Sequence, residues 1–280
     1  MVNFGRTDLA SEAHSLRRAG ALPGVTAREE RLEGLAVTAV EVRPGEGARL
    51  LGKAPGQYYT LELPQHCERG SEAFPRAARA LAALILRCGV GSWHSVLIAA
   101  LGNPDITPDA LGSLAASQLL VTRHLKQSGV EAFRSFASTA LCRTGVLGTT
   151  GVESAAQIRS LCRELEPDGV AAIDALAGAS LAGLCRSVQV CDTGIAPGSG
   201  VGNDRQALDA ATLGRPVLAI GVPTVTDAAQ FSSEAALAQM FITPRSIDSA
   251  VRSAARVIAY GLNLALHPGL ELADIDMLLG

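Results

Sequence analysis

Two aspartates, Asp109 and Asp174, follow strongly apolar segments of the chain in matching settings. Asp109 comes shortly after the run 96–101, and Asp174 directly follows Val170–Ile173. Parallel sheets place ligands beyond the carboxyl ends of their strands, so we expect both carboxylates at solvent-accessible strand ends around one pocket. One carboxylate can then stay ionised while the other holds a proton, which is the minimum for acid–base hydrolysis. The alternative is that each aspartate only caps the following helix.

The turn that carries Asp109 has the composition of a helix start. Thr107 suits the N-cap and Pro108 the first helical position, and Asn103 lies earlier in the same turn as a candidate cleft residue. A helix N-terminus favours the ionised form of an acid. The turn therefore predicts an ionised Asp109, suited to be a base or a metal ligand, with ordinary capping as the alternative.

A glycine-dense segment, Cys191–Asn203, follows a predicted strand. Its small residues allow a backbone to approach a ligand, and successive free N–H groups can bind an oxyanion. A phosphate loop is the rival interpretation, but the Lys-Ser/Thr ending of a Walker A motif and the dinucleotide spacing are both missing. A purely structural tight loop is the other alternative. The candidate cleft residues of this segment are Asp192, Gly198, Ser199, Gly200, Gly202 and Asn203.

The histidines and cysteines give weaker signals. His124 lies at a predicted helix end, where it could cap, pack or shape the cleft, and no Ser or Cys stands in a nucleophile elbow, so no Ser–His–Asp triad is predicted. The six cysteines form no C-x-x-C pair and are expected to be small buried hydrophobes. We expect no metal and no cofactor.

Composition narrows the class of protein. Apolar residues make up 48% of the 280 residues and aromatic residues only 4%, which favours parallel α/β packing. A net charge of −3 gives no basic footprint for nucleic acid. No apolar run is long enough to span a membrane, and residues 1–8 lack a signal core. We expect a cytoplasmic protein that binds neither nucleic acid nor membranes.

Strand and helix patterns alternate along most of the chain, which predicts a mainly parallel sheet covered on both faces, in a single domain of residues 1–280. Residues 1–40 are polar and helix-leaning, with Arg28–Arg31 as a solvated helix face. The predicted strands are 37–42, 58–63, 96–101, 170–173, 188–191 and 217–222. The predicted helices are 71–87, 110–125, 153–165, 205–212, 234–240 and 246–264.

These segments together resemble the germination protease family of endospore-forming bacteria. The resemblance extends in order from residue 6 to about residue 268. The strings that carry it are Arg6–Ala10, Gly102-Asn103, Thr107–Gly112, Val121–Leu125, Gly148–Glu153, Ile173–Ala177, Asp192–Ile195, Pro197–Asn203 and Ile220–Thr224.

The resemblance implies the three-layer α/β/α fold of the hydrogenase-maturation endopeptidases and a homotetramer. It also implies an aspartic-type endopeptidase that acts on small acid-soluble spore proteins in the spore interior, with Asp109 and Asp174 as the catalytic pair. Two alternatives stay open. One is a metal-dependent, maturation-type endopeptidase with Asp109 among the ligands, and the other is a non-catalytic paralogue that only binds.

Three features depart from the family pattern. Only Met1–Gly5, a candidate remnant of the zymogen pro-segment, precede the Arg-Thr-Asp string. The family's long insertion between Thr224 and Thr243 is missing, and Gly178-Ala179 stand where the family tends to carry arginine. The stretch Thr7–Glu12 resembles the sites that the family cuts. We expect the chain to be active as translated or after loss of Met1–Gly5; alternatively, Thr7–Glu12 is a packed structural arm.

Overall fold

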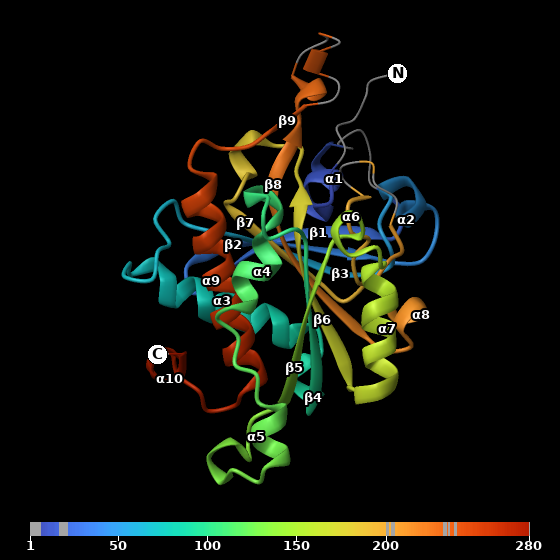
Figure 1. Ribbon diagram of the computed structural model, residues 1–280. Helices are drawn as coiled ribbons and strands as arrows, with labels where there is room; N and C mark the ends of the chain where they lie inside the picture. Colours follow the sequence, from blue (N-terminus) through green and yellow to red (C-terminus); the bar gives the residue numbers. More distant parts are fainter. Residues whose placement is uncertain are drawn as a thin grey trace.

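A computed structural model of the chain describes residues 7–16, 22–199, 202, 205–231, 234, 236–237 and 240–279. In this part of the chain a central sheet has the order β1-β2-β3-β7-β8-β6-β4-β5, and β9 pairs with β8 (Figure 1). The strands are β1 (Val25–Leu32), β2 (Leu35–Val42), β3 (Gly56–Glu62), β4 (Ser95–Leu101), β5 (Ser138–Gly145), β6 (Gly169–Ala177), β7 (Ser187–Cys191), β8 (Val217–Asp227) and β9 (Phe241–Ile242). The helices are α1 (Ala10–Leu16), α2 (Glu46–Leu51), α3 (Ala73–Arg87), α4 (Leu111–Ala116), α5 (Arg123–Gln127), α6 (Leu147–Thr150), α7 (Ser154–Leu165), α8 (Ala210–Leu213), α9 (Ile247–Leu266) and α10 (Leu272–Leu279).

The sheet is mixed and divides at β8. Strands β5, β4, β6 and β8 run parallel to their neighbours, whereas β8, β7, β3, β2 and β1 pair antiparallel. The parallel half contains the apolar strands with helical connections, because parallel neighbours need a crossover between them. The predicted α/β class is confirmed, with the parallel pairing confined to one half of the sheet.

Helices cover both faces of the sheet, which gives three layers (Figure 1). Side chains alternate between the faces of a strand: on β6, Ala171 and Ile173 pack in the cluster with α3, α4 and α9, whereas Val170 and Ala172 pack in the cluster with α7 and α8. Helices α1 and α2 cover the same side as α7, farther along the sheet. The α/β/α sandwich therefore surrounds strands made largely of alanine and aliphatic residues.

The prediction for Arg28–Arg31 was wrong: these residues lie in β1, an edge strand of the antiparallel half. β1 and β2 form a hairpin in which Leu32 pairs with Leu35. The two turn residues, Glu33 and Gly34, have φ angles of 51° and 77°, the positive values that a two-residue hairpin turn needs. The strand is largely exposed, so its charged composition reflects a solvated edge.

The predicted helix 110–125 is broken into α4 and α5. The side chain of Asn263 on α9 accepts a hydrogen bond from the N–H of Leu120 (3.0 Å) and donates one to the carbonyl of Gln118 (2.9 Å). These contacts satisfy backbone groups that a continuous helix would bond internally, so a residue far along the chain ends α4.

Other elements match the predictions with changed limits. β2, β3, β4, β7, α3, α7 and α9 lie close to their predicted ranges. The predicted strands 170–173 and 217–222 extend to Ala177 and Asp227, and the predicted helix 205–212 shrinks to α8. α2, β5 and α10 were not anticipated. The predicted helix 234–240 lies partly outside the described residues.

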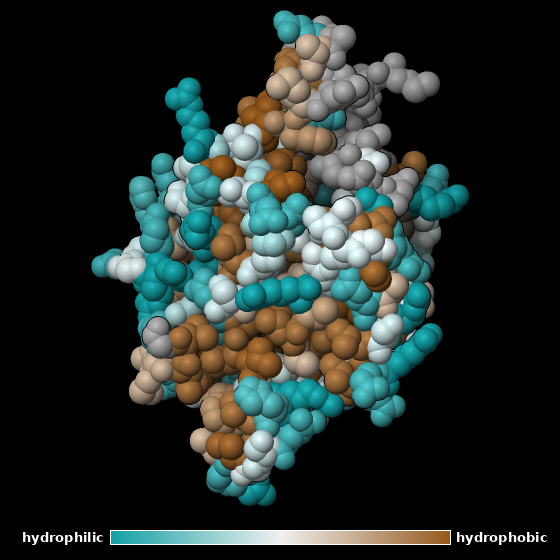
Figure 2. Space-filling view, viewed as in Figure 1, coloured by the Kyte–Doolittle hydropathy of each residue, from teal (hydrophilic) through white to brown (hydrophobic). Residues whose placement is uncertain are grey.

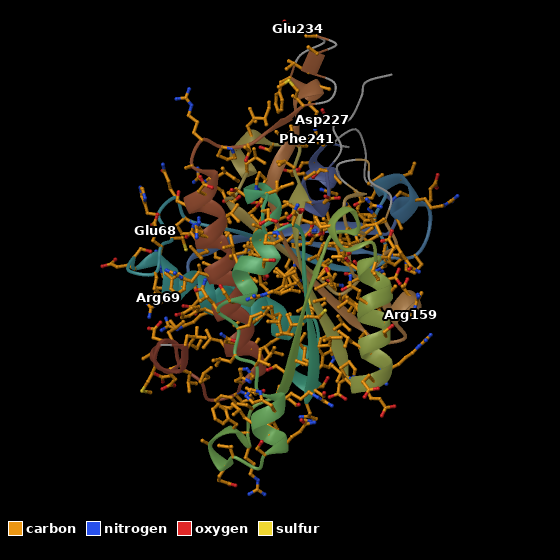
Figure 3. The ribbon with its side chains drawn as sticks, in the orientation of Figure 1. Glu68, Arg69, Arg159, Asp227, Glu234 and Phe241 are labelled. Carbon is orange, nitrogen blue, oxygen red and sulfur yellow. The ribbon has the colours of Figure 1, made fainter. Side chains whose placement is uncertain are left out.

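The end of β8 projects beyond the body of the sheet and carries β9. Asp227 of β8 pairs with Phe241 of β9 (Figure 3). Phe241, Met240 and Phe231 are about half exposed there. None of the helices in the described part of the chain is both long and apolar enough to cross a membrane.

Candidate functional site

Asp174 is buried inside β6. It pairs in register with Gly221 of β8, and its exposed fraction is 4%. The prediction of a solvent-accessible strand end was wrong for this residue, because β6 continues to Ala177 alongside the extended β8. Among the described residues its carboxyl group accepts one hydrogen bond, from the N–H of Ala175 (3.0 Å). The side chain is therefore buried with a single backbone N–H as its hydrogen-bond donor in the described part of the chain.

Asp109 ends a 3₁₀ turn, η2 (Thr107–Asp109), just before α4. The turn folds back closely onto the end of β4: a Cβ at Gly102 would lie 2.0 Å from the carbonyl oxygen of Asp109, so only glycine fits there. The N–H of Asn103 donates to Asp109 Oδ2 (2.8 Å). Asn103, one of the predicted site residues, thus orients the carboxylate through its backbone.

The fold brings the two aspartates together. The turn η2 contacts β6 and β8, and a Cβ at Gly112 on α4 would lie 2.8 Å from the carbonyl oxygen of Ile173, the residue before Asp174. The negative charge of Asp109 also acts on Asp174. Gly102 and Gly112 therefore let η2 and α4 lie close to β4 and β6, because neither glycine has a side chain that would separate the backbones.

Burial raises the pKa of both carboxyl groups. The pKa of Asp174 lies well above its ordinary value because of burial first and the charge of Asp109 second. Burial also raises the pKa of Asp109, against the opposing effect of the Asn103 N–H. A helix N-terminus was expected to favour the ionised form of Asp109; instead Asp109 lies in a single 3₁₀ turn, where burial raises its pKa.

The glycine-dense segment begins where β7 ends. The carboxylate of Asp192 accepts a hydrogen bond from the N–H of Gln57 (2.8 Å), so it ties the segment to β3 and is not directed at the aspartates. Gly198 and Gly202 have φ angles of 73° and 78°, and Ser199 lines a cavity. Two further predicted residues, Gly200 and Asn203, lie outside the described residues.

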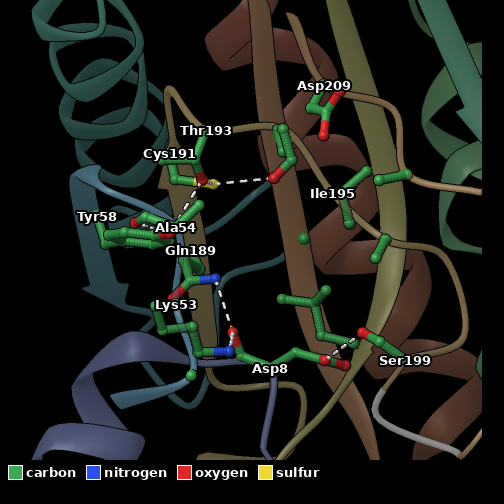
Figure 4. Close-up of a pocket in the computed structure, with 17 residues that line it drawn as sticks. Asp8, Lys53, Ala54, Tyr58, Gln189, Cys191, Thr193, Ile195, Ser199 and Asp209 are labelled. Carbon is green, nitrogen blue, oxygen red and sulfur yellow. Dashed lines mark hydrogen bonds between the residues drawn. The ribbon is translucent and has the colours of Figure 1, made fainter. Parts of the chain in front are cut away.

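A cavity of about 290 Å³ lies along the strand that carries Asp174, and Figure 4 draws the residues that line it. Leu176, two residues farther along β6, and Gly221, the register partner of Asp174, both line it. Other lining residues come from the turn after α2, from β3, β7 and the glycine-dense segment; they include Lys53, Tyr58, Gln189, Cys191 and Ser199. The candidate site therefore has a cavity of mixed polar and apolar lining along the strand of the buried acid.

Asp8 is a residue of this region that the sequence interpretation missed. It lines the cavity, and its charge adds to that of Asp109 in raising the pKa of Asp174. Leu9 and Ala10 are fully buried, with exposed fractions of 1% and 0%. The segment is therefore a packed arm, which was one of its two interpretations. The available signal was the string Arg6–Ala10 in the family resemblance.

His124 is not brought to the aspartates. It is exposed on α5, which leads into the start of β5, at the end of the sheet opposite η2 (Figure 1). The six cysteines are free and buried or half-buried, as expected. No group of three His, Cys, Asp or Glu side chains is arranged to hold a metal ion within the described ranges.

Comparisons with known proteins agree with the pattern of motifs. A family model described as germination protease matches residues 6–238. The chain is 37% identical to a germination protease of Caldanaerobacter subterraneus subsp. tengcongensis over 316 residues, which cover 98% of each chain. It is 34% identical to one of Clostridium tetani, covering 97% of this chain and 98% of that protein. It is 40% identical to one of a Geobacillus species, covering 82% of this chain and 65% of that protein.

Among solved structures, a NiFe hydrogenase maturation protease, HycI from Thermococcus kodakarensis KOD1, matches 64% of this chain and 98% of its own length. The TM-score is 0.36 and the identity is 17%.

Proposed function

This chain belongs to the germination protease family, and we propose that it hydrolyses small acid-soluble spore proteins with Asp109 and Asp174 as its catalytic pair. Membership of the family makes the chain a peptidase. The observation that carries the finer proposal is the pairing of two desolvated carboxyl groups of unequal environment at one end of the sheet. Such pairs divide into an acid and a base because their pKa values are separated.

The environments assign the two roles. Asp174 is the more deeply buried and faces the charge of Asp109, so it keeps its proton and serves as the acid. Asp109 is half-buried and accepts the N–H of Asn103, which stabilises its ionised form relative to that of Asp174. In this mechanism Asp109 takes a proton from the attacking water. Asp174 polarises the scissile carbonyl or gives its proton to the leaving nitrogen.

The glycine-dense segment shapes the cleft in this proposal. Gly198 and Ser199 lie next to the cavity along the strand that carries Asp174, and glycines at positive φ allow backbone N–H groups to face a ligand. The cavity next to Leu176 offers room for a side chain of the substrate peptide. Because Asp174 is buried, little water reaches it. A bound peptide would displace what remains.

The direct test is to incubate the purified protein with an acid-soluble spore protein and to map the fragments by mass spectrometry, with and without a chelator. We expect cleavage at a small number of bonds, unaffected by the chelator. Loss of cleavage on chelation would favour the metal-dependent alternative. Retention of the spore protein without fragments would favour the non-catalytic paralogue.

We also propose that the chain assembles as a homotetramer. β5 is an edge strand whose residues are mostly only half-buried, and Met277 and Leu278 on α10 are 76% and 42% exposed. Figure 2 shows hydrophobic side chains gathered in a band across this face of the molecule, from α10 toward β5. An apolar band of this kind is typical of a subunit contact. Light scattering that returned a monomer mass at all concentrations would contradict the assembly.

A further inference from the structure

Asp8, on the arm before α1, bonds the strand that carries Asp174. Its N–H donates to the carbonyl oxygen of Ala177 (2.9 Å), and the N–H of Ala177 donates to its carboxylate Oδ2 (2.8 Å). β4 pairs with β6 only as far as Ile173, whereas β8 accompanies β6 to Ala177, so beyond Ile173 the backbone groups of β6 that face away from β8 need another partner. Asp8 supplies it three residues past Asp174.

The other carboxylate oxygen of Asp8 reaches the glycine-dense segment. Ser199 Oγ donates to Asp8 Oδ1 at 2.9 Å (Figure 4). A single carboxylate therefore bridges the end of β6 and the segment that borders the cavity. Without the Asp8 carboxylate, this bridge between the segment and the strand of the buried acid would be lost.

The backbone carbonyl of Asp8 is fixed as well. Lys53 Nζ donates to it at 2.8 Å and Gln189 Nε2 at 3.1 Å (Figure 4). All four polar atoms of Asp8 thus have partners, from the turn after α2, from β6, β7 and the glycine-dense segment. These hydrogen bonds come from separate parts of the fold, so together they hold the carboxylate of Asp8 in one position.

Asp174 and Asp8 have different charged neighbours. Asp8 and Asp109 both act on Asp174, whereas the positive charge of the half-buried Lys53 acts on Asp8. Other groups that act on Lys53 are Glu12 and Cys191. Asp174 therefore lies beside two carboxylates, one from η2 and one from the arm.

We propose that Asp8 is a positioning residue of the catalytic site, which fixes the glycine-dense segment against the end of β6 and places a second negative charge, besides that of Asp109, near Asp174. This inference rests on the proposed peptidase function. Asp8 acts through Asp174 and Ser199 and does not take part in bond breaking. A nearby negative charge favours the protonated form of an acid, so Asp8 keeps Asp174 able to donate its proton at higher pH.

Three variants separate the parts of this role. D8N keeps both side-chain hydrogen bonds, since its amide can accept from Ala177 and donate to Ser199, but it removes the charge. S199A keeps the charge and removes the contact to the segment. E12Q is the matched control, because Glu12 lies nearby in α1 and accepts the N–H groups of Ala179 and Ser180, but it is not among the charges that act on Asp174.

The measurements are the pH profile of kcat/KM for cleavage of an acid-soluble spore protein and a carbon NMR titration of the Asp174 carboxyl group. For D8N we expect the alkaline limb of the profile to move down by roughly half to one pH unit, with the same change in the titration. For S199A we expect KM to rise about three- to tenfold without a shift in the profile. E12Q should match the wild-type profile.

The inference is overturned if D8N and E12Q give the same profile and the same titration as the wild type. If D8N fails to fold, judged by circular dichroism, an unchanged KM in S199A overturns the positioning of the segment. The NMR titration requires no turnover. A shifted Asp174 titration in a protein that cleaves nothing would support this inference while contradicting the proposed function.

Discussion

Polar groups are buried at both ends of the parallel half of the sheet, but they are satisfied differently. At the end near the start of β5, Thr122, Thr139 and Asn263 exchange hydrogen bonds with one another or with backbone groups of Gln118 and Leu120. At the other end Asp174 is as deeply buried, yet among the described residues its carboxyl accepts one hydrogen bond and faces two like charges. The first arrangement stabilises the fold, and the second has the properties of a reactive site.

The difference separates buried polar groups that support the fold from a buried acid that is suited to a reaction. A buried hydroxyl or amide with all its partners costs little and fixes backbone geometry. A buried carboxyl without a cation has a shifted pKa and lowers stability unless it holds a proton. Substitutions at the two ends should therefore separate cleanly, with activity lost at one end and stability at the other.

The largest expected effect is on catalysis. D109N and D174N should each lower kcat/KM by about 10²–10⁴-fold while the fold stays intact, since this is the usual cost of losing an acid or base. Cleavage of an acid-soluble spore protein, with circular dichroism as a fold check, measures it. D105N, on the exposed part of the same turn, is the control. More than about a hundredth of the wild-type rate in either variant would contradict the pair, because that lies above the usual range.

At the opposite end the loss should be in stability. N263A leaves the N–H of Leu120 and the carbonyl of Gln118 without their partners, and two unsatisfied buried groups cost about 2–4 kcal/mol. Urea unfolding measures the change. S253A, on the same helix, loses a single hydrogen bond to the carbonyl of Cys67 and should cost about 1 kcal/mol. A clear fall in kcat for N263A with unchanged stability would break the contrast between the two ends.

His267 should make this end sensitive to acid. It is fully buried against Phe136, and burial, with Lys126 nearby, lowers the pKa of His267 to about 4. As pH falls from about 6.5 the unfolded chain takes up the proton and the folded chain does not, so stability falls until about pH 4, by at most about 3 kcal/mol. H267Q should lack this part of the loss in urea unfolding between pH 7 and pH 4.5. H124Q, at an exposed histidine, should retain it.

The smallest effect is a gain of stability at the end of the sheet that holds Asp174. The raised pKa of Asp174 means that the folded chain keeps a proton which the unfolded chain gives up, so stability is lost as pH rises from about 4 through the folded-state pKa. D174N removes this loss, and each pKa unit corresponds to about 1.4 kcal/mol. We expect its thermal midpoint to exceed that of the wild type by a few degrees at pH 8 and not at pH 4. An equal midpoint at both values would mean that Asp174 is ionised without cost in the folded chain.

The sequence by itself determined the elements of the parallel half and the identity of the paired acids. Short apolar runs that alternate with segments of helical periodicity are buried together as a sheet between helices. The elements β4, β6, β8, α3 and α9 therefore follow from the local sequence pattern. The positions of Asp109 and Asp174 near the ends of such runs placed them at one edge of the sheet. The motif strings around them were specific enough to indicate the family.

The tertiary structure alone decided how these residues are surrounded. The extent of β6 past Asp174 depends on the length of β8 beside it, which buries a carboxyl expected to be accessible. The break between α4 and α5 depends on Asn263, and the arrival of Asp8 depends on a segment from the start of the chain. Hydrogen-bond partners and desolvation come from residues far apart in sequence, and local patterns contain no record of them.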